Sequence, residues 1–252
     1  MSLVSYLEAI PKAELYIQLE GAMRTQTLRM IAEQNEVPYS DKDYQQWLDA
    51  LQSPDPSAYE TLARAVSRWL QMPEDLTRVV YDLGVELSKQ NVRYAEVMVN
   101  PSYYLQNGWS FDDFFNALTD GADRALRGWN VHMQWIFAIQ RSEPRRADEI
   151  SRWATNITSQ RAGVVALGLF GREDAQPLGQ FERAFRTAEK KGLPRAPHVD
   201  NDGEKDEILP AFDMLLPNRL YSAWGIHDIP EAIDRLAAER IPVVISLARA
   251  MN

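Results

Sequence analysis

The chain has 252 residues, of which 45% are hydrophobic and 25% are charged, which is the composition of an ordinary soluble globular protein. Its formal net charge is -9 at pH 7, and acidic and basic residues are interleaved without a basic stripe, so we expect no nucleic-acid partner. It contains no cysteine, which excludes disulfides, thiolate nucleophiles and cysteine-based metal sites.

The N-terminal residues predict no secretion signal. Residues 1–15 are mixed in polarity around Pro11 and Lys12, and they lack the basic start and apolar run of a signal peptide. No apolar stretch in the chain approaches the roughly 18 residues that a membrane helix needs. We therefore expect a cytoplasmic protein with no membrane partner.

Short β-branched and aromatic runs alternate with amphipathic segments along the chain, a pattern typical of parallel βα units. The predicted strands are Glu14–Glu20, Val92–Asn100, His132–Gln140, Gly163–Phe170, Arg195–Asp200, Arg219–Trp224 and Pro242–Ala248. The predicted helices are Pro73–Gln90, Phe111–Leu126, Pro144–Thr158, Gly179–Lys190 and Pro230–Glu239.

These elements favour one domain over residues 1–252, of α/β class, folded as a TIM-type (β/α) barrel. The segment between the first two strands is longer than one crossover requires, and it predicts a helical cap insert over about residues 36–72. No eighth strand is apparent after residues 242–248, which leaves an open barrel edge through which two copies could pair. A doubly wound open sheet is the alternative fold.

Functional residues of such a barrel lie at the C-terminal ends of its strands. Alternation along the first strand predicts that Tyr16, Gln18 and Glu20 share one face, and alternation along the fifth places His198 and Asp200 together. With Asn201 and Ser222, these side chains would offer hydrogen-bond donors and acceptors to a polar ligand.

Residues 11–22 read Pro-Lys-Ala-Glu-Leu-Tyr-Ile-Gln-Leu-Glu-Gly-Ala, which resembles the opening motif of the adenosine deaminase family, proline-lysine-x-glutamate-leucine-His-x-His-leucine-acid-glycine. Similar segments follow in order at Tyr94–Pro101, Val164–Glu173, Pro197–Asn201, Arg219–Gly225 and Ile241–Ala250. The resemblance covers nearly the whole chain. It implies an amidohydrolase-type barrel and a hydrolase acting on the amino group of a purine nucleoside.

The resemblance also shows where this chain departs from the family. Tyr16 and Gln18 stand at the places of two zinc-binding histidines, and Ser222 stands at the place of a histidine that assists the attacking water. His198 keeps a zinc-ligand place, while Asn201 replaces the glutamate that shuttles protons. A catalytic zinc usually needs at least three protein ligands, so we expect no zinc and no other cofactor.

Several functions remain open on these grounds. The first is a catalytically inactive, repurposed or redesigned small-molecule-binding protein, with a purine-nucleoside-like ligand. The second is a metal-independent enzyme that uses His198 with Tyr16 or Ser222. Residual purine deamination and an interaction role through the open edge near Val243–Ile245 complete the set. The candidate ligand-binding residues are Tyr16, Gln18, Gly168, Phe170, His198, Asn201, Ser222 and Trp224.

Overall fold

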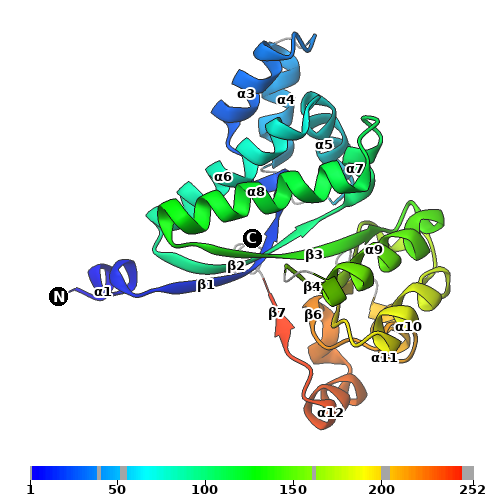
Figure 1. The fold of residues 1–252 in the computed structure, drawn as a ribbon. Helices are drawn as coiled ribbons and strands as arrows, with labels where there is room; N and C mark the ends of the chain where they lie inside the picture. Colours follow the sequence, from blue (N-terminus) through cyan, green and yellow to red (C-terminus); the bar gives the residue numbers. More distant parts are fainter. Residues whose placement is uncertain (1, 39–40, 52–55, 161–162, 200–204, 246–252) are drawn as a thin grey trace. The chain divides into compact units, whose positions relative to one another are not determined.

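The computed structural model describes residues 2–38, 41–51, 56–160, 163–199 and 205–245 (Figure 1). The chain forms two compact units, Met1–Ser53 with Ala58–Gln134 and Pro54–Ser57 with Trp135–Asn252. Among the described residues, seven strands follow one another in chain order from β1 to β7. The strand pairings within each unit are all parallel. A doubly wound sheet would reverse its strand order at a switch point, so the chain order confirms the predicted barrel class.

The first unit contains the first two strands and the helices that precede and follow them. Its elements are α1 (Leu3–Ala9), β1 (Lys12–Gln18), α2 (Leu19–Ala22), α3 (Thr25–Gln34), α4 (Asp41–Leu51), α5 (Pro56–Trp69), α6 (Pro73–Lys89), β2 (Val92–Val99), α7 (Pro101–Leu105) and α8 (Phe111–Trp129). The predicted helices at residues 73–90 and 111–126 are confirmed as α6 and α8. None of the helices in the described part of the chain has the length and apolar character needed to cross a bilayer.

The second unit continues the alternation of strands and helices. Its elements are β3 (His132–Gln140), η1 (Pro144–Arg146), α9 (Ala147–Gln160), β4 (Val164–Phe170), η2 (Glu173–Ala175), η3 (Leu178–Gln180), α10 (Glu182–Lys190), β5 (Arg195–Val199), η4 (Lys205–Glu207), α11 (Ile208–Leu215), β6 (Leu220–Ser222), η5 (Trp224–Asp228), α12 (Pro230–Glu239) and β7 (Val243–Val244). The described part of β7 is short, and residues 246–252 lie outside the described residues.

Several predicted strands end earlier in the structure than the sequence pattern indicated. β2 ends at Val99 and β7 at Val244, and β1 and β6 differ for reasons that the structure shows. β1 ends at Gln18, and Glu20 lies in the short helix α2. β6 ends at Ser222 because Ser222 and Ala223 take left-handed backbone angles, with φ of 68° and 50°. Trp224 therefore begins a 3-10 helix instead of ending a strand.

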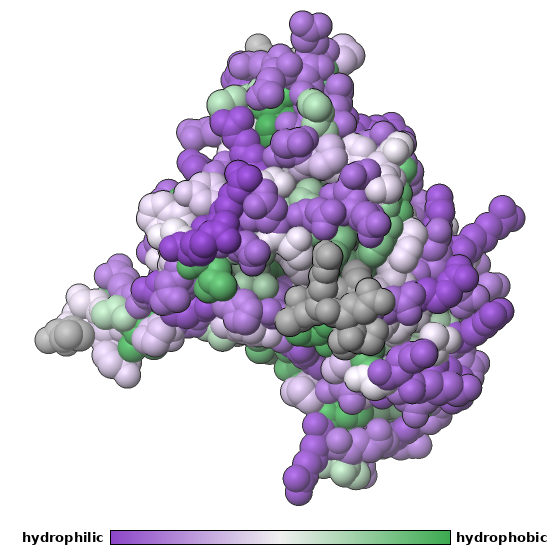
Figure 2. Space-filling model, in the orientation of Figure 1, coloured by the Kyte–Doolittle hydropathy of each residue, from purple (hydrophilic) through white to green (hydrophobic). Residues whose placement is uncertain are grey.

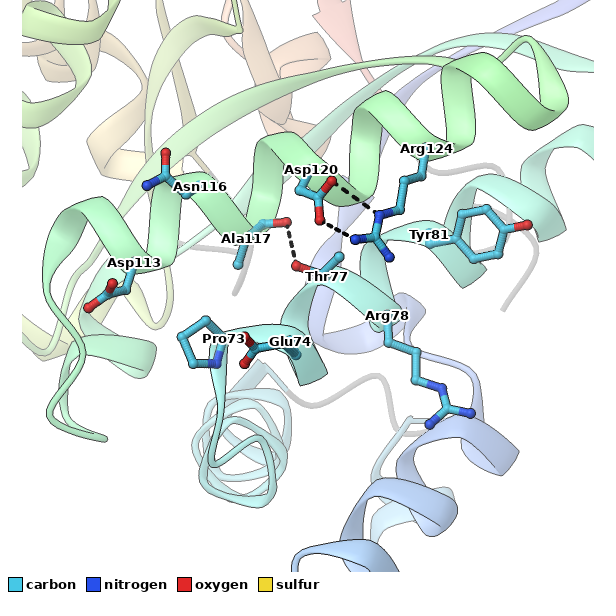
Figure 3. Close-up of a pocket in the computed structure, with 10 residues that line it drawn as sticks. All are labelled: Pro73, Glu74, Thr77, Arg78, Tyr81, Asp113, Asn116, Ala117, Asp120 and Arg124. Carbon is cyan, nitrogen blue, oxygen red and sulfur yellow. Dashed lines mark hydrogen bonds and ion pairs between the residues drawn. The ribbon is translucent and has the colours of Figure 1, made fainter.

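Helices α6 and α8 pack closely because small residues lie between them. A Cβ atom at Gly121 of α8 would lie 2.7 Å from the carbonyl oxygen of Thr77 and 2.7 Å from Cβ of Val80. The Thr77 hydroxyl donates to the carbonyl oxygen of Ala117, at 3.2 Å, across the same contact (Figure 3). The glycine thus sets the distance at which the two helices meet.

The junction between α3, α5 and α6 depends on one buried carboxylate. Asp75 Oδ2 accepts hydrogen bonds from Asn35 Nδ2 at 2.7 Å and from the backbone N–H groups of Gln71 and Met72 at 3.0 and 3.1 Å. Asn35 also donates to the carbonyl oxygen of Trp69 at 2.9 Å.

Amphipathic helices place their apolar stripe inward, and Figure 2 shows mostly hydrophilic side chains over α3 and α4 and, separately, over α9 and α10.

We predict that Gly121→Ala destabilises the protein by about 1–3 kcal/mol, because the added methyl group overpacks the contact with α6. Gly128→Ala is the matched control in the same helix, since a Cβ there meets nothing within 4 Å. Removing a helical glycine at that open position should raise the free energy of unfolding by about 0.5–1 kcal/mol. Urea denaturation measures both effects, and equal changes in the two variants would contradict the packing argument.

Candidate functional site

One face of the second unit's sheet carries a row of buried side chains at the strand ends. Gln140 of β3 pairs with Phe170 of β4, and His198 of β5 pairs with Tyr221 of β6. All four side chains are buried. The imidazole of His198 packs against the phenol ring of Tyr221, with 5.3 Å between ring centroids and a 59° angle between the planes. We call these four residues the strand-end row.

A row of small residues lies directly beneath the strand-end row. Ala138, Gly168 and Ala196 are register partners across β3, β4 and β5. Each stands two residues before its strand's member of the strand-end row, so the two rows share one face of the sheet. One glycine and two alanines place little bulk below Phe170 and His198. Gly168 and Phe170, two of the predicted ligand-binding residues, therefore belong to the same face as His198.

Ser222 is placed differently from His198 by the strand register. It pairs with Val199, one residue beyond His198, and it is buried where β6 ends. The next residue, Ala223, donates its N–H to the carbonyl oxygen of Val199 at 2.7 Å. Trp224 follows as a half-buried residue whose backbone oxygen lies 2.7 Å from Nδ1 of His227. Left-handed backbone at a non-glycine residue is costly, and it clusters at functional positions.

In the first unit, the predicted pair Tyr16 and Gln18 lies at the end of β1. Both side chains are half-buried, and Ile17 between them is buried. The pairing with β2 shifts register between Glu14 and Ile17, which is a bulge that places an extra residue in β1. Gln18 pairs with Met98 of β2.

Glu20 does not share a strand face with Tyr16 and Gln18, so the prediction from alternation is wrong at this residue. The chain turns into α2 at Leu19, and the Glu20 carboxylate is buried there. The hydroxyl of Tyr104 donates to Glu20 Oε1 at 3.0 Å, and Tyr104 is fully buried. Burial, followed by the negative charge of Glu20, raises the pKa of Tyr104 well above its ordinary value of 10.0, so the phenol remains a donor.

The end of β2 presents two buried polar atoms for which the described residues supply no hydrogen-bond partner, Nδ2 of Asn100 and Oγ of Ser102. The other end of the Asn100 amide is engaged, because Oδ1 accepts the backbone N–H of Ser102 at 3.0 Å. Buried polar groups nearly always have a partner, either protein, water or ligand. The sequence pattern did not indicate either residue.

The described residues contain no group of three or more His, Asp or Glu side chains placed to hold a metal ion. Two of the residues discussed from the sequence, Asp200 and Asn201, lie outside the described residues.

The family model for adenosine deaminase matches residues 11–251. The chain belongs to the adenosine deaminase family. It is 26% identical to an adenosine deaminase of Clostridium kluyveri, over 100% of this chain and 73% of that protein. Its fold is similar to that of an amidohydrolase from Burkholderia ambifaria with bound Zn, with a TM-score of 0.87 and 26% identity over 97% of this chain and 68% of that one. It also resembles the fold of Arabidopsis ADAL complexed with GMP, with a TM-score of 0.79 and 22% identity over 96% of this chain and 73% of that one.

Arg141 organises the strand-end loops of this adenosine deaminase family chain, and the sequence analysis missed it. Its side chain is 1% exposed. Nη1 donates to the carbonyl oxygens of Glu173 and Gln176 at 2.8 and 3.4 Å, and Nη2 donates to Glu207 Oε2 at 2.5 Å. One guanidinium therefore connects the segments that follow β3, β4 and β5. The sequence feature that could have indicated this residue is an arginine directly after a buried strand.

A second connection joins the segments after β5 and β6. Lys205 donates to Asp228, and the stem of Lys205 lies against Gly225, where a Cβ would come within 2.6 Å of it. His227 Nε2 lies 3.1 Å from the other oxygen of Asp228. The hydrogen bond from Lys205 lowers the pKa of Asp228. This connection is exposed, in contrast to the buried one made by Arg141.

A separate groove of about 830 Å³ lies between α6 and α8 of the first unit (Figure 3). Most of its lining residues are of polar or charged type, and Arg124 of α8 forms an ion pair with Asp120 at 2.7 Å. None of the predicted site residues lines it. We therefore place the candidate site of this family member at the strand ends and not in the groove.

We predict that Arg141→Met lowers the free energy of unfolding by about 3 kcal/mol. Removing the buried cation leaves the Glu207 carboxylate and two carbonyl groups without their hydrogen-bond donor. Arg145→Met, at an exposed neighbouring arginine, should change stability by less than about 0.5 kcal/mol. Thermal and urea denaturation of both variants measure the difference. A stable Arg141→Met protein would show that other contacts hold these loops.

Tyr104→Phe should lower the free energy of unfolding by about 2 kcal/mol, because it removes a donor to a buried carboxylate. The raised pKa means that this stabilisation is complete below about pH 10 and is lost as the pH rises through the folded-state pKa. Absorbance titration at alkaline pH should show that the late-ionising phase of the parent loses the amplitude of one tyrosine in the variant. Tyr94→Phe is the control, since Tyr94 donates to Glu96 at 2.9 Å but is only half-buried. Its loss should leave the late phase intact.

Proposed function

We propose that this chain is a small-molecule-binding member of the adenosine deaminase family that binds a purine-type ligand and does not deaminate it through zinc. The main support for this proposal comes from two residues at the end of β1. Tyr16 and Gln18 occupy the positions at which the family motif has two zinc-binding histidines. A phenol and a carboxamide do not supply the imidazole nitrogens that such a site uses.

The residues present fit zinc poorly elsewhere as well. His198 keeps the place of a third ligand, and Ser222 stands at the place of the histidine that assists the attacking water. A single imidazole falls short of the three protein ligands that catalytic zinc usually has. The proposal therefore assigns His198 to ligand binding and derives no reaction step through a metal.

The strand-end row suits a flat heterocycle. Phe170 and Tyr221 supply aromatic surface for stacking, and His198 and Gln140 supply hydrogen-bonding groups beside it. The side chains beneath the row are small, two alanines and one glycine. Small-molecule sites commonly combine apolar or aromatic walls with a few polar groups in this way.

The first unit supports the same class of ligand through its own polar groups. Tyr16 and Gln18 are half-buried, and Asn100 and Ser102 each present a buried polar atom at the end of β2. A structure of the same fold from Arabidopsis holds GMP. A purine ring with attached polar groups is the ligand class that these features favour.

A second candidate is a metal-independent enzyme, and the backbone of Ser222 favours it. Ser222 has a left-handed φ of 68° at the end of β6, next to the strand that carries His198. A serine hydroxyl becomes nucleophilic only when a base such as imidazole is within reach. Tyr16 would be the alternative acid or base. This candidate requires turnover without metal that disappears in Ser222→Ala or Tyr16→Phe.

The test combines three measurements on the purified, untagged protein expressed with zinc in the medium. We expect zinc well below one equivalent by elemental mass spectrometry, no conversion of adenosine by ultraviolet absorbance, and saturable binding of adenosine, inosine or GMP by calorimetry. His198→Ala should weaken binding about tenfold, since a tenfold change corresponds to about 1.4 kcal/mol, one good hydrogen bond. His132→Ala, at an exposed histidine of β3, should leave the affinity unchanged.

The outcomes separate the candidates. Stoichiometric zinc together with adenosine conversion would overturn the proposal and establish an ordinary deaminase. Metal-free turnover that is lost in the Ser222 or Tyr16 variant would establish the second candidate. Absence of binding for all three ligands would reject the purine class.

A further inference from the structure

The second unit has a hollow at the opposite ends of its strands, away from the strand-end row. It has a volume of about 310 Å³ and lies where β5 begins, where the loop before β6 passes, and where the chain enters β7. Three arginines and two glutamates line it: Arg195, Arg235, Arg240, Glu189 and Glu239. Its lining thus carries more positive than negative charge in a chain whose formal net charge is -9.

Arg195 is the central group of this hollow, because its guanidinium is half-buried and forms no ion pair with a carboxylate of the described residues. Nε donates to the carbonyl oxygen of Leu216 at 2.8 Å, and Nη1 donates to that of Leu193 at 3.3 Å. A guanidinium has five N–H donors. The contacts of the described residues occupy two of them and leave Nη2 without a partner. Burial lowers the pKa of Arg195, and the charge of Glu189 opposes that effect.

The other two arginines differ in how their charges are balanced. Arg235 is neutralised, since Nη1 lies 2.8 Å from Asp213 and Nε lies 3.1 Å from Glu239. Arg240 is exposed at the end of α12, and no ion pair to it occurs among the described residues. The hollow therefore combines two arginines that form no ion pair among the described residues, Arg195 and Arg240, with one whose charge is balanced.

We propose that this hollow is a binding site for a small oxyanion of the phosphate class, either inorganic phosphate or a small phosphomonoester. Guanidinium groups bind phosphate oxygens through paired, charge-assisted hydrogen bonds. The Nη2 donors of Arg195 supply one such pair, and Arg240 supplies charge at the rim. The volume lies at the lower limit of small-molecule sites, about 300–1,000 Å³, which suits a phosphate group better than a large ligand. This site is independent of the proposed purine site.

The experiment measures binding of sodium phosphate and of β-glycerophosphate to the full chain by calorimetry, with sodium chloride at equal ionic strength as the reference. We expect saturable binding of at least one of them. Tighter binding of glycerophosphate would indicate a phosphomonoester, and tighter binding of phosphate would indicate the free ion. His198→Ala should bind both as the parent does, which separates this site from the purine site.

Three variants locate the binding. Arg240→Gln should weaken affinity about tenfold. Thermal stability without phosphate should not change, because none of the described residues forms an ion pair with the Arg240 side chain. Arg195→Gln should abolish binding. If this variant does not fold, Arg195→Lys replaces it, and we expect the lysine variant to show a large loss of affinity. Arg127→Gln, at an exposed arginine of α8, is the control and should bind normally. No saturable binding at tens of millimolar phosphate, or equal affinity in the Arg240 and control variants, would overturn the proposal.

Discussion

The strand-end loops of the second unit depend on one buried guanidinium, that of Arg141. A buried cation is tolerated only when its charge and its donors are satisfied. Arg141 meets this requirement with Glu207 and with the carbonyl oxygens of Glu173 and Gln176. Glu173 and Gln176 follow β4 and Glu207 follows β5, so satisfying one side chain also fixes the loops after β4 and β5 relative to the end of β3.

The buried polar groups of the chain fall into two kinds. Asp75 and Glu20 are engaged by donors of their own unit, and these contacts hold helices in place. Asn100 Nδ2 and Ser102 Oγ have no such partner among the described residues. Because burial of a polar group costs free energy unless it is hydrogen-bonded, the second kind indicates where a ligand or water belongs. This distinction separates the scaffold from the candidate sites better than residue type does.

Membership of the adenosine deaminase family accounts for the fold of the chain, and this fold is compatible with more than one chemistry. The same parallel strands place Gln140, Phe170, His198 and Tyr221 on one face whichever reaction or ligand they serve. Barrels of this class host many activities because function resides in strand-end residues and loops. The proposed loss of zinc chemistry therefore requires no change in the fold.

The sequence by itself determined the order and type of most elements, because the apolar runs of β2 and β3 and the helical pattern of α12 are local properties of the chain. It also placed His198 and Phe170 at strand ends, since alternation within a regular strand requires no distant contact. Only the tertiary structure decided where β1 and β6 stop, because Glu20 turns inward to the distant Tyr104 and Ser222 adopts a left-handed backbone. The roles of Arg141 and Arg195 were likewise decided by tertiary structure, because each depends on carbonyl and carboxylate groups that only folding brings to one guanidinium.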